Sequence, residues 1–499
     1  MTYLAPAKNR LLAICLSVAA LVVLATASSA SAADTVYWAD YGSNHIAFAN
    51  LSGGGAGYLD ITGASGIEAN GVAIDSAAGR IYWVAAAPPK VYFANLAGGG
   101  GGELNIAGAT TTGFAVGVAV EPALGRVYWA NGEKNTISYA NLNGSGGGDL
   151  DTAGATVQDP LGVDVDPNTG RVYWANGEKK PLTTTEEISY ASLTGGGGGD
   201  LNTSGATVDE PAGVAVDSTT GRIYWGNYLG NSISYANLNG TGGGDLPTTG
   251  LTAESPFGVS VDPTAGRVYW TAEGPGKIAY ASTAGSGGAD LDTTGVTPNL
   301  PAFPIILKAP SPLAVPKASG SVKPGSTLTC TPGTWAPDLI ESFLYRAPQS
   351  TGIQWLKKGQ PVAGATATTL KATAVGDYAC QSSATNRAGS TSQTSAPVGV
   401  FKLGKVAVNK KKGTATISVQ VPGAGTLTLS GKKVAKVKKK RSASSPETLK
   451  LAVKAKGKAK KALSRKGKAK VKISVAFTPL GGSAGTQTKT LTLKKKLSG

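Results

Sequence analysis

One pattern of thirteen residues, GVAVD-x3-GR-[IV]-YW, recurs through the first three-fifths of the chain and constrains the fold more than any other feature. It is cleanest at residues 213–225. With small variations it returns at residues 71–83, 117–129, 162–174 and 258–270, and its second half stands alone at 36–38. The Tyr-Trp pairs are separated by 45, 46, 45, 51 and 45 residues. A period in this range indicates a repeat architecture.

Each repeat unit reads as four short strands. Residues 213–216 and 222–225 are rich in bulky β-formers and are separated by turn residues. Residues 232–238 form an alternating third strand, and a Gly-rich tip then leads to a short edge segment. Four strands in about 45 residues is typical of a β-propeller blade, so we expect an all-β fold.

The unit resembles the YWTD repeat of the low-density lipoprotein receptor family, which forms six-bladed propellers. The resemblance covers residues 34–308. It is carried by the GVAVD strand, the Gly-Arg turn, the Tyr-Trp pair and the Ile-x-x-Ala-x-Leu-x-Gly third strand. The Thr-Asp that follows Tyr-Trp in the family is here AD, VA, AN, AN, GN or TA. The resemblance therefore implies a partial hydrogen-bond network at these positions.

Six Tyr-Trp pairs stand beside only five complete units, because the first unit lacks its GVAVD strand. Residues 295–310 align with residues 205–220, which puts residues 301–307 where the missing strand belongs. We predict that this segment completes the first blade and closes the ring, which removes an exposed sheet edge.

The repeated residues read as structural rather than catalytic, because catalysis needs one special site. We expect one large aromatic per blade to pack between blades: Trp38, Trp83, Trp129, Trp174, Trp225 and Trp270. An acid also precedes an Arg in each complete unit, as Asp217 precedes Arg222. That spacing suggests either a turn motif or a repeated salt bridge.

The irregular segments after Tyr-Trp are the candidate binding loops, since loops on a rigid scaffold often carry specificity. Unit four has six extra residues within residues 179–187, and unit two has an apolar, proline-bearing segment at residues 84–90. We expect both to project from the same end of the propeller. Their candidate residues are Val84, Pro88, Pro89, Lys179, Lys180 and Glu186. The alternative is that these irregularities are neutral.

Residues 311–399 form a second module. Cys330, Trp355 and Cys380 follow a Cys-x24-Trp-x24-Cys spacing, and Tyr378 lies two residues before the second Cys. These are marks of an immunoglobulin-like sandwich. The module resembles Ig-like repeats of secreted bacterial surface proteins, a resemblance that implies a Cys330–Cys380 disulfide.

Residues 400–499 form a third module, rich in lysine. From residue 401 onward the chain has 27 Lys or Arg and one acid, Glu447. Alternating patterns at residues 414–421, 426–430, 448–454, 469–477 and 489–495 predict a small all-β, sandwich-like domain. It resembles a lysine-rich C-terminal module of secreted actinobacterial proteins.

The charge balance differs sharply between the parts: residues 34–307 carry a net −16, and residues 308–499 a net +31. We expect cell-envelope polyanions or glycans as partners of the basic module. The alternatives are a solvated face, pairing with the acidic propeller, and nucleic acid. Nucleic acid is disfavoured because no aromatic residue is interleaved with the lysines for base stacking.

Residues 1–33 read as a signal peptide, with a basic start, an apolar run of 15 residues and an Ala-Ser-Ala cleavage pattern. That run is too short for a comfortable membrane span, and we expect no transmembrane helix in the mature chain. The predicted location is extracellular, secreted and associated with the cell surface.

Catalytic residues are scarce. His45 is the single histidine, and both mature cysteines are expected to be bridged. We expect no enzyme activity and no cofactor, although repeated Asp and Asn oxygens could hold a structural Ca²⁺. The sequence favours a non-catalytic binding or adhesion protein with a glycan or protein ligand. The alternative is a propeller hydrolase or lyase, which a cluster of non-repeated Asp, Glu and Asn at the channel mouth would favour.

Overall fold

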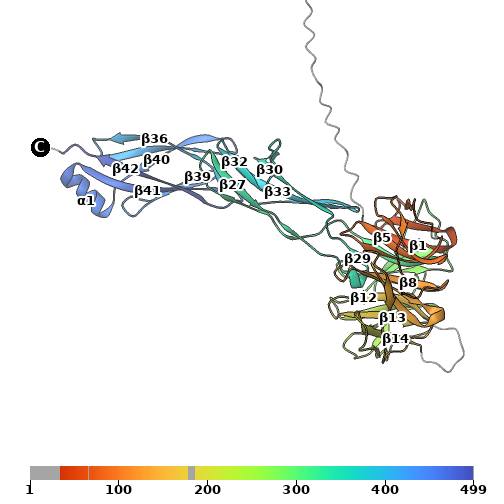
Figure 1. The fold of residues 1–499 in the computed structure, drawn as a ribbon. Coiled ribbons are helices and arrows are strands. Elements are labelled where there is room, and N and C mark those ends of the chain that lie inside the picture. Colours follow the sequence, from red (N-terminus) through yellow and green to blue (C-terminus); the bar gives the residue numbers. More distant parts are fainter. Residues whose placement is uncertain (1–33, 66, 178–185, 498–499) are drawn as a thin grey trace, which may run out of the picture.

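The computed structural model describes residues 34–65, 67–177 and 186–497. The predicted signal peptide, Lys179 and Lys180 lie outside these ranges. Figure 1 shows a propeller at one end of an elongated molecule and two smaller β modules extending from it. Within the described ranges, no helix has the length and apolar character needed to cross a membrane.

Six four-stranded antiparallel blades form the propeller. Blade 1 contains β24 (Pro301–Leu307), β1 (Thr35–Asp40), β2 (His45–Asn50) and β3 (Gly57–Tyr58). Blade 2 contains β4 (Ile67–Asp75), β5 (Arg80–Ala87), β6 (Pro89–Asn95) and β7 (Gly102–Glu103). Blade 3 contains β8 (Ala115–Glu121), β9 (Arg126–Asn131), β10 (Thr136–Asn141) and β11 (Gly147–Asp149). Blade 4 contains β12 (Pro160–Asp166), β13 (Arg171–Asn176), β14 (Glu187–Ser192) and β15 (Gly199–Asp200). Blade 5 contains β16 (Pro211–Asp217), β17 (Arg222–Asn227), β18 (Ser232–Asn237) and β19 (Gly243–Asp245). Blade 6 contains β20 (Pro256–Asp262), β21 (Arg267–Ala272), β22 (Lys277–Ser282) and β23 (Gly288–Asp290).

The ring closes through the strand predicted for that purpose. β24 pairs antiparallel with β1, from Thr35 opposite Leu307 to Asp40 opposite Pro301. The first and last described parts of the propeller therefore share one blade. Each innermost strand, namely β4, β8, β12, β16, β20 and β24, contacts the innermost strands of both neighbouring blades. The closed ring therefore gives every blade a neighbour on both sides.

The six repeated Trp side chains are fully buried. One buried cluster joins Ala73 and Tyr82 of blade 2 to Trp129 of blade 3, so the indole packs across a blade boundary. In blades 3 to 6 the indole N–H also donates to a backbone carbonyl, as from Trp225 to Thr207 at 3.0 Å. A buried indole whose N–H is hydrogen-bonded stabilises the blade by packing and also holds the side chain in a fixed position.

The repeated acids make turns rather than salt bridges. The Asp217 carboxylate accepts the backbone N–H of Thr219 at 2.9 Å. The Arg222 guanidinium instead lies 4.2 Å from the centre of the Tyr235 ring, and the other four complete units have an equivalent contact. No described ion pair joins the acid and Arg of one repeat. The turn interpretation of this spacing is therefore the one the structure supports.

The network after Tyr-Trp is partial, as the resemblance implies. In blade 5, Asn227 donates to Ser234 at 2.7 Å, and Ser234 donates to Asp245 at 2.6 Å. Blades 3 and 4 repeat this chain of hydrogen bonds. In blade 6 the equivalent side chain is missing, and Thr271 accepts the Gly258 N–H instead.

The Cys330–Cys380 disulfide joins the two larger sheets of the second module, which confirms the predicted bridge. The Tyr378 hydroxyl donates back to the Ala374 carbonyl at 3.1 Å, and Trp355 is fully buried. Its elements are β25 (Pro312–Ala314), β26 (Lys317–Gly320), β27 (Ser326–Thr331), β28 (Thr334–Trp335), η3 (Ile340–Ser342), β29 (Leu344–Tyr345), β30 (Ser350–Lys357), β31 (Gln360–Pro361), β32 (Thr369–Ala372), β33 (Gly376–Asn386), β34 (Gly389–Thr394) and β35 (Val398–Val400).

The third module also has two sheets. They contain β36 (Lys402–Asn409), β37 (Thr414–Val421) and β40 (Glu447–Val453) in one, and β38 (Gly425–Ser430), β39 (Val437–Arg441), β41 (Lys468–Pro479) and β42 (Gly485–Lys494) in the other. All five predicted strands are present. Beside its strands the module contains one helix that the sequence analysis did not predict, α1 (Gly457–Lys466), which buries Ala459 and Leu463. Alternating Lys and Ala obscured the i, i+4 spacing of these two apolar residues.

Candidate functional site

The two ends of the propeller channel differ, because the second module covers one of them. Residues 336–349 leave the second module between β28 and β30 and lie across the ends of the inner strands. There β29 pairs in parallel with β24, with Leu344 opposite Ile306. Phe343, Leu344 and Tyr345 are buried. We call residues 336–349 the plug segment.

Polar contacts attach the plug segment to several blades. Ser342 donates its hydroxyl to the Val216 carbonyl at 2.7 Å. Glu341 accepts hydrogen bonds from Ser218 and Asn168, and Asp338 accepts one from Ser76. These partners belong to blades 2, 4 and 5, so the plug segment ties together blades that are remote in sequence.

The plug segment covers carboxylates that are buried with it. Asp164 is fully buried and accepts the backbone N–H of Val216 at 2.9 Å. Burial raises its pKa well above the ordinary Asp value. Burial also raises the pKa of Glu341, although the hydrogen bond from Ser218 opposes the rise. Both groups therefore favour their neutral forms more than an exposed carboxyl does.

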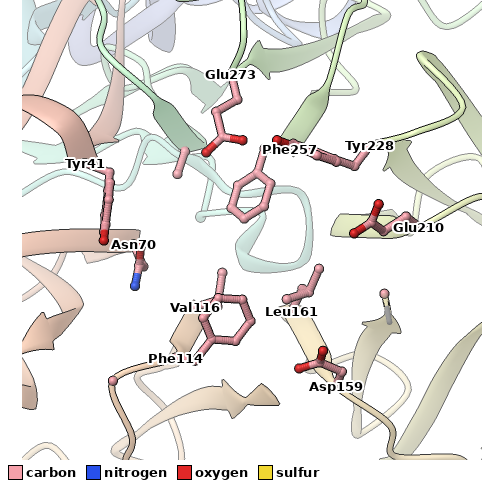
Figure 2. Close-up of a pocket in the computed structure, with 13 residues that line it drawn as sticks. Tyr41, Asn70, Phe114, Val116, Asp159, Leu161, Glu210, Tyr228, Phe257 and Glu273 are labelled. Atoms are coloured by element: carbon pink, nitrogen blue, oxygen red, sulfur yellow. The ribbon is translucent and has the colours of Figure 1, made fainter. Parts of the chain in front are cut away.

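The opposite end is an open mouth with a cavity of about 300 Å³. Figure 2 shows side chains from all six blades around this opening. The carboxylates of Glu273, Glu210 and Asp159 lie along one side of it, and Tyr41 and Asn70 lie on the other. The aromatic and apolar lining residues are Tyr41, Phe114, Val116, Leu161, Tyr228, Phe257 and Ala302.

Nearly all of the lining comes from three positions that recur in every repeat. These are the third residue before the Gly of GVAVD, the residue directly before that Gly, and the third residue after the Trp. The first position is occupied in successive units by Glu68, Phe114, Asp159, Glu210, Ser255 and Leu300. Equivalent backbone sites thus carry different side chains, and the mouth is asymmetric although its scaffold is repeated.

A repeated hydrogen bond holds this first position, which has an unusual backbone conformation. Five of its six residues have φ between 45° and 59°, a region that non-Gly residues seldom occupy. In four blades its N–H donates to a side chain of the preceding blade, at 2.8 to 3.0 Å. The acceptors are Asn44, Asn135, Glu186 and Asn231. We call this contact the rim latch.

The described lining of the mouth carries charge of one sign, because among the described residues it includes three carboxylates and no Lys, Arg or His. Burial, with a hydrogen bond to Glu273 and the charges of Glu273 and Glu210, raises the pKa of Tyr228 to about 12. Burial and the nearby carboxylates of Glu68 and Glu273 also raise the pKa of Tyr41. Both phenols stay protonated beside the acids and can donate hydrogen bonds.

The predicted binding residues stand in different places from those expected. The segment containing Val84, Pro88 and Pro89 does not form a projecting loop. Val84 is buried in β5, Pro89 begins β6, and only Pro88 is in a turn. The alanines of this segment extend the β5–β6 hairpin up to the pair Ala86 and Pro89, which leaves no room for a loop.

Glu186 lies at the mouth, but it accepts the Glu210 N–H as part of the rim latch, in the place that Asn occupies in other blades. Sequence reasoning missed the lining residues themselves. An alignment of the five complete repeats against each other shows the signal that marks them, because these positions vary while the GVAVD and Tyr-Trp stretches stay nearly constant.

Among the described residues, the mouth has neither a histidine nor a group of metal ligands. His45 begins β2 and is exposed, with its ring 4.3 Å from the Tyr58 ring. Among the described residues, no three His, Cys, Asp or Glu side chains are grouped as metal ligands. The repeated acids that were considered for Ca²⁺ hold turn N–H groups instead.

No family model and no curated protein matches this chain. Among solved structures, a chain from the crystal structure of a nidogen/laminin complex is similar, with 16% identity and a TM-score of 0.46. The match covers 55% of this chain and 98% of that chain. We draw nothing about function from a similarity at this level. The observed structure is an all-β protein whose first part is a six-bladed propeller.

Proposed function

We propose that this chain is a non-catalytic interaction protein whose propeller mouth binds a cationic group of a protein partner. The single observation that carries the proposal is the described part of the cavity lining, which has aromatic rings and three carboxylates and, among the described residues, no basic side chain. Aromatic faces and carboxylates both attract ammonium and guanidinium groups, and these attractions strengthen where water is partly excluded. The plug segment closes the other end, so a ligand enters from one side.

The modules beyond the propeller suit an extracellular role. We propose that the second module is an Ig-like spacer, supported by the disulfide between its sheets and the hydrogen bond of Tyr378. Disulfides persist in oxidising compartments, which supports export of the chain. The third module, with its excess of lysine, would hold the protein on anionic polymers of the cell envelope.

A second candidate, a hydrolase or lyase, is favoured by one observation: the acids at the mouth come from some blades only, with Asp159 and Glu210 at one repeat position and Glu273 at another. Paired carboxylates can serve as general acid and base. Binding remains the better-supported function, because the described residues bring no imidazole, thiol or group of metal ligands to the cavity.

The test is selection of displayed random peptides on the full-length chain. We expect enrichment of Lys or Arg, and loss of that enrichment in the double variant Asp159→Asn, Glu273→Gln. The matched control is Asp60→Asn, Asp292→Asn, which removes the same charge from two exposed loops and keeps an acceptor for their turns. Equal loss in both variants, or no enrichment with the wild type, contradicts the proposal. Hydrolysis of a peptide or glycan that the Asp159, Glu273 variant cannot cleave would favour the second candidate.

A further inference from the structure

The third module brings three cationic segments together at its far end. Residues 410–412, 458–466 and 494–496 contain eleven Lys or Arg side chains, all exposed. Figure 1 shows α1 and the C-terminal end of the chain at the end of the molecule farthest from the propeller. We call this set the distal cationic surface.

Backbone contacts fix the three segments against each other. The Lys495 N–H donates to the Gly467 carbonyl at 2.7 Å, and the Lys496 N–H donates to the Lys410 carbonyl at 2.9 Å. Gly413 has φ +64°, and a Cβ there would lie 2.9 Å from Leu463 and 3.2 Å from Lys495. A glycine at this position therefore allows the helix and the chain end to approach the turn closely.

The distal cationic surface has no acid of its own. Glu447, the single acid after residue 401, pairs with Arg441 at the other end of the module, next to the second module. There Gly423 lies beside both Ser444 and Asp377. The positive charges of this surface repel each other because they have no acidic partner nearby, and a bound anionic ligand would reduce that repulsion.

We propose that the distal cationic surface, rather than the lysine-bearing strand faces, is the site that binds a linear phosphate polymer. This inference rests on the proposed function of the third module as an anchor. The partner carries no bases for stacking, because the module's two aromatic residues, Phe401 and Phe477, are buried. We assign phosphate as the charged group of the polymer, because Lys, a common phosphate binder that acts as a compact point charge, supplies nearly all of the module's positive charge. The basic residues after position 401 are 25 Lys and 2 Arg.

End-on binding would also orient the molecule. The second module contacts the closed end of the propeller, through the plug segment, and the mouth opens on the opposite face. A chain held by its distal cationic surface therefore keeps the acidic mouth away from the anionic polymer layer, which would repel it. The mouth stays accessible to a cationic partner.

The experiment compares two full-length variants with the same change in charge, each binding linear polyphosphate across a salt series. The distal variant is Lys411→Gln, Lys458→Gln, Lys461→Gln, Arg465→Gln, Lys495→Gln. The control variant, on exposed strand positions, is Lys405→Gln, Lys438→Gln, Lys440→Gln, Lys470→Gln, Lys472→Gln. Gln has nearly the helix propensity of Lys, and unchanged melting curves check that both variants fold.

We expect the distal variant to bind polyphosphate about 100-fold more weakly at low salt. The slope of the logarithm of the binding constant against the logarithm of the salt concentration should fall in magnitude by about 3, because each lost phosphate contact removes about 0.7 from that slope. The affinity of the control variant for polyphosphate should change by about threefold or less. Equal losses of polyphosphate affinity in both variants would contradict the distal site but would still be consistent with anchoring by the third module. No loss in either variant overturns both ideas. Wild-type binding to polygalacturonate as tight as to polyphosphate overturns the preference for phosphate.

Discussion

The two ends of the propeller channel are made from the same six inner strands, yet they differ in how their side chains vary between blades. At the closed end, each complete unit repeats an acid, a turn and an Arg, and the plug segment packs over this uniform surface. At the mouth, equivalent positions carry Asn70, Val116, Leu161 and Phe257. Repeated residues thus build the scaffold, and the positions that vary between repeats form the site.

The largest expected effect comes from the repeated scaffold. Trp225→Ala removes a fully buried indole and leaves the Thr207 carbonyl without its indole donor. We expect a loss of about 3–5 kcal/mol in the free energy of unfolding. The measurement is denaturant unfolding of the propeller followed by circular dichroism.

The matched control for this variant is Leu229→Ala, in the same blade but 56% exposed near the mouth. It should cost about 0.5 kcal/mol or less, as surface changes usually do. Similar losses for the two variants would break the distinction between a structural interior and a permissive rim.

A smaller effect, dependent on pH, is expected at the closed end. The pKa of Glu341 is raised from its ordinary value of 4.5, so the folded state holds this proton more tightly than the unfolded state. Its contribution to stability is present below that ordinary value and is lost as pH rises through the raised pKa. Glu341→Gln should therefore flatten the pH dependence of the propeller's melting temperature over this range.

Gln at position 341 still offers an acceptor to Ser218, so the contact itself is kept. Glu133→Gln, at an exposed position, serves as the control and should leave the pH profile unchanged. A profile that is as steep in the Glu341 variant as in the wild type would show that another group governs it, with Asp164 the next candidate.

The smallest expected effect is at the rim latch. Asn231→Gly removes the acceptor for the Ser255 N–H but tolerates the φ of 50° at this position. We expect a loss of about 1 kcal/mol or less, the usual net value of one hydrogen bond. Asn231→Asp keeps an acceptor and should lose less. Wild-type stability of the glycine variant would mean that the latch does not hold the mouth.

Some features could be predicted from local pattern alone. The period of the Tyr-Trp pairs indicated blades, and the alignment of residues 301–307 with the GVAVD strand identified β24, because both depend on spacing along the chain. Other features could not. Glu186 looked like a loop residue with a free charge, and only the contact with Glu210 in the next blade shows its place in the latch.

The sequence by itself determined the repeat, its number of strands, the closing strand and the disulfide, because hydrophobic alternation, turn residues and fixed spacing are local properties. Only the tertiary structure decided which side chains meet around the mouth, that residues 336–349 close the other end, and that three lysine-bearing segments converge at the distal cationic surface. The reason is physical: these sites join residues from different blades or modules. Their proximity is set by ring closure and packing, which no local pattern records.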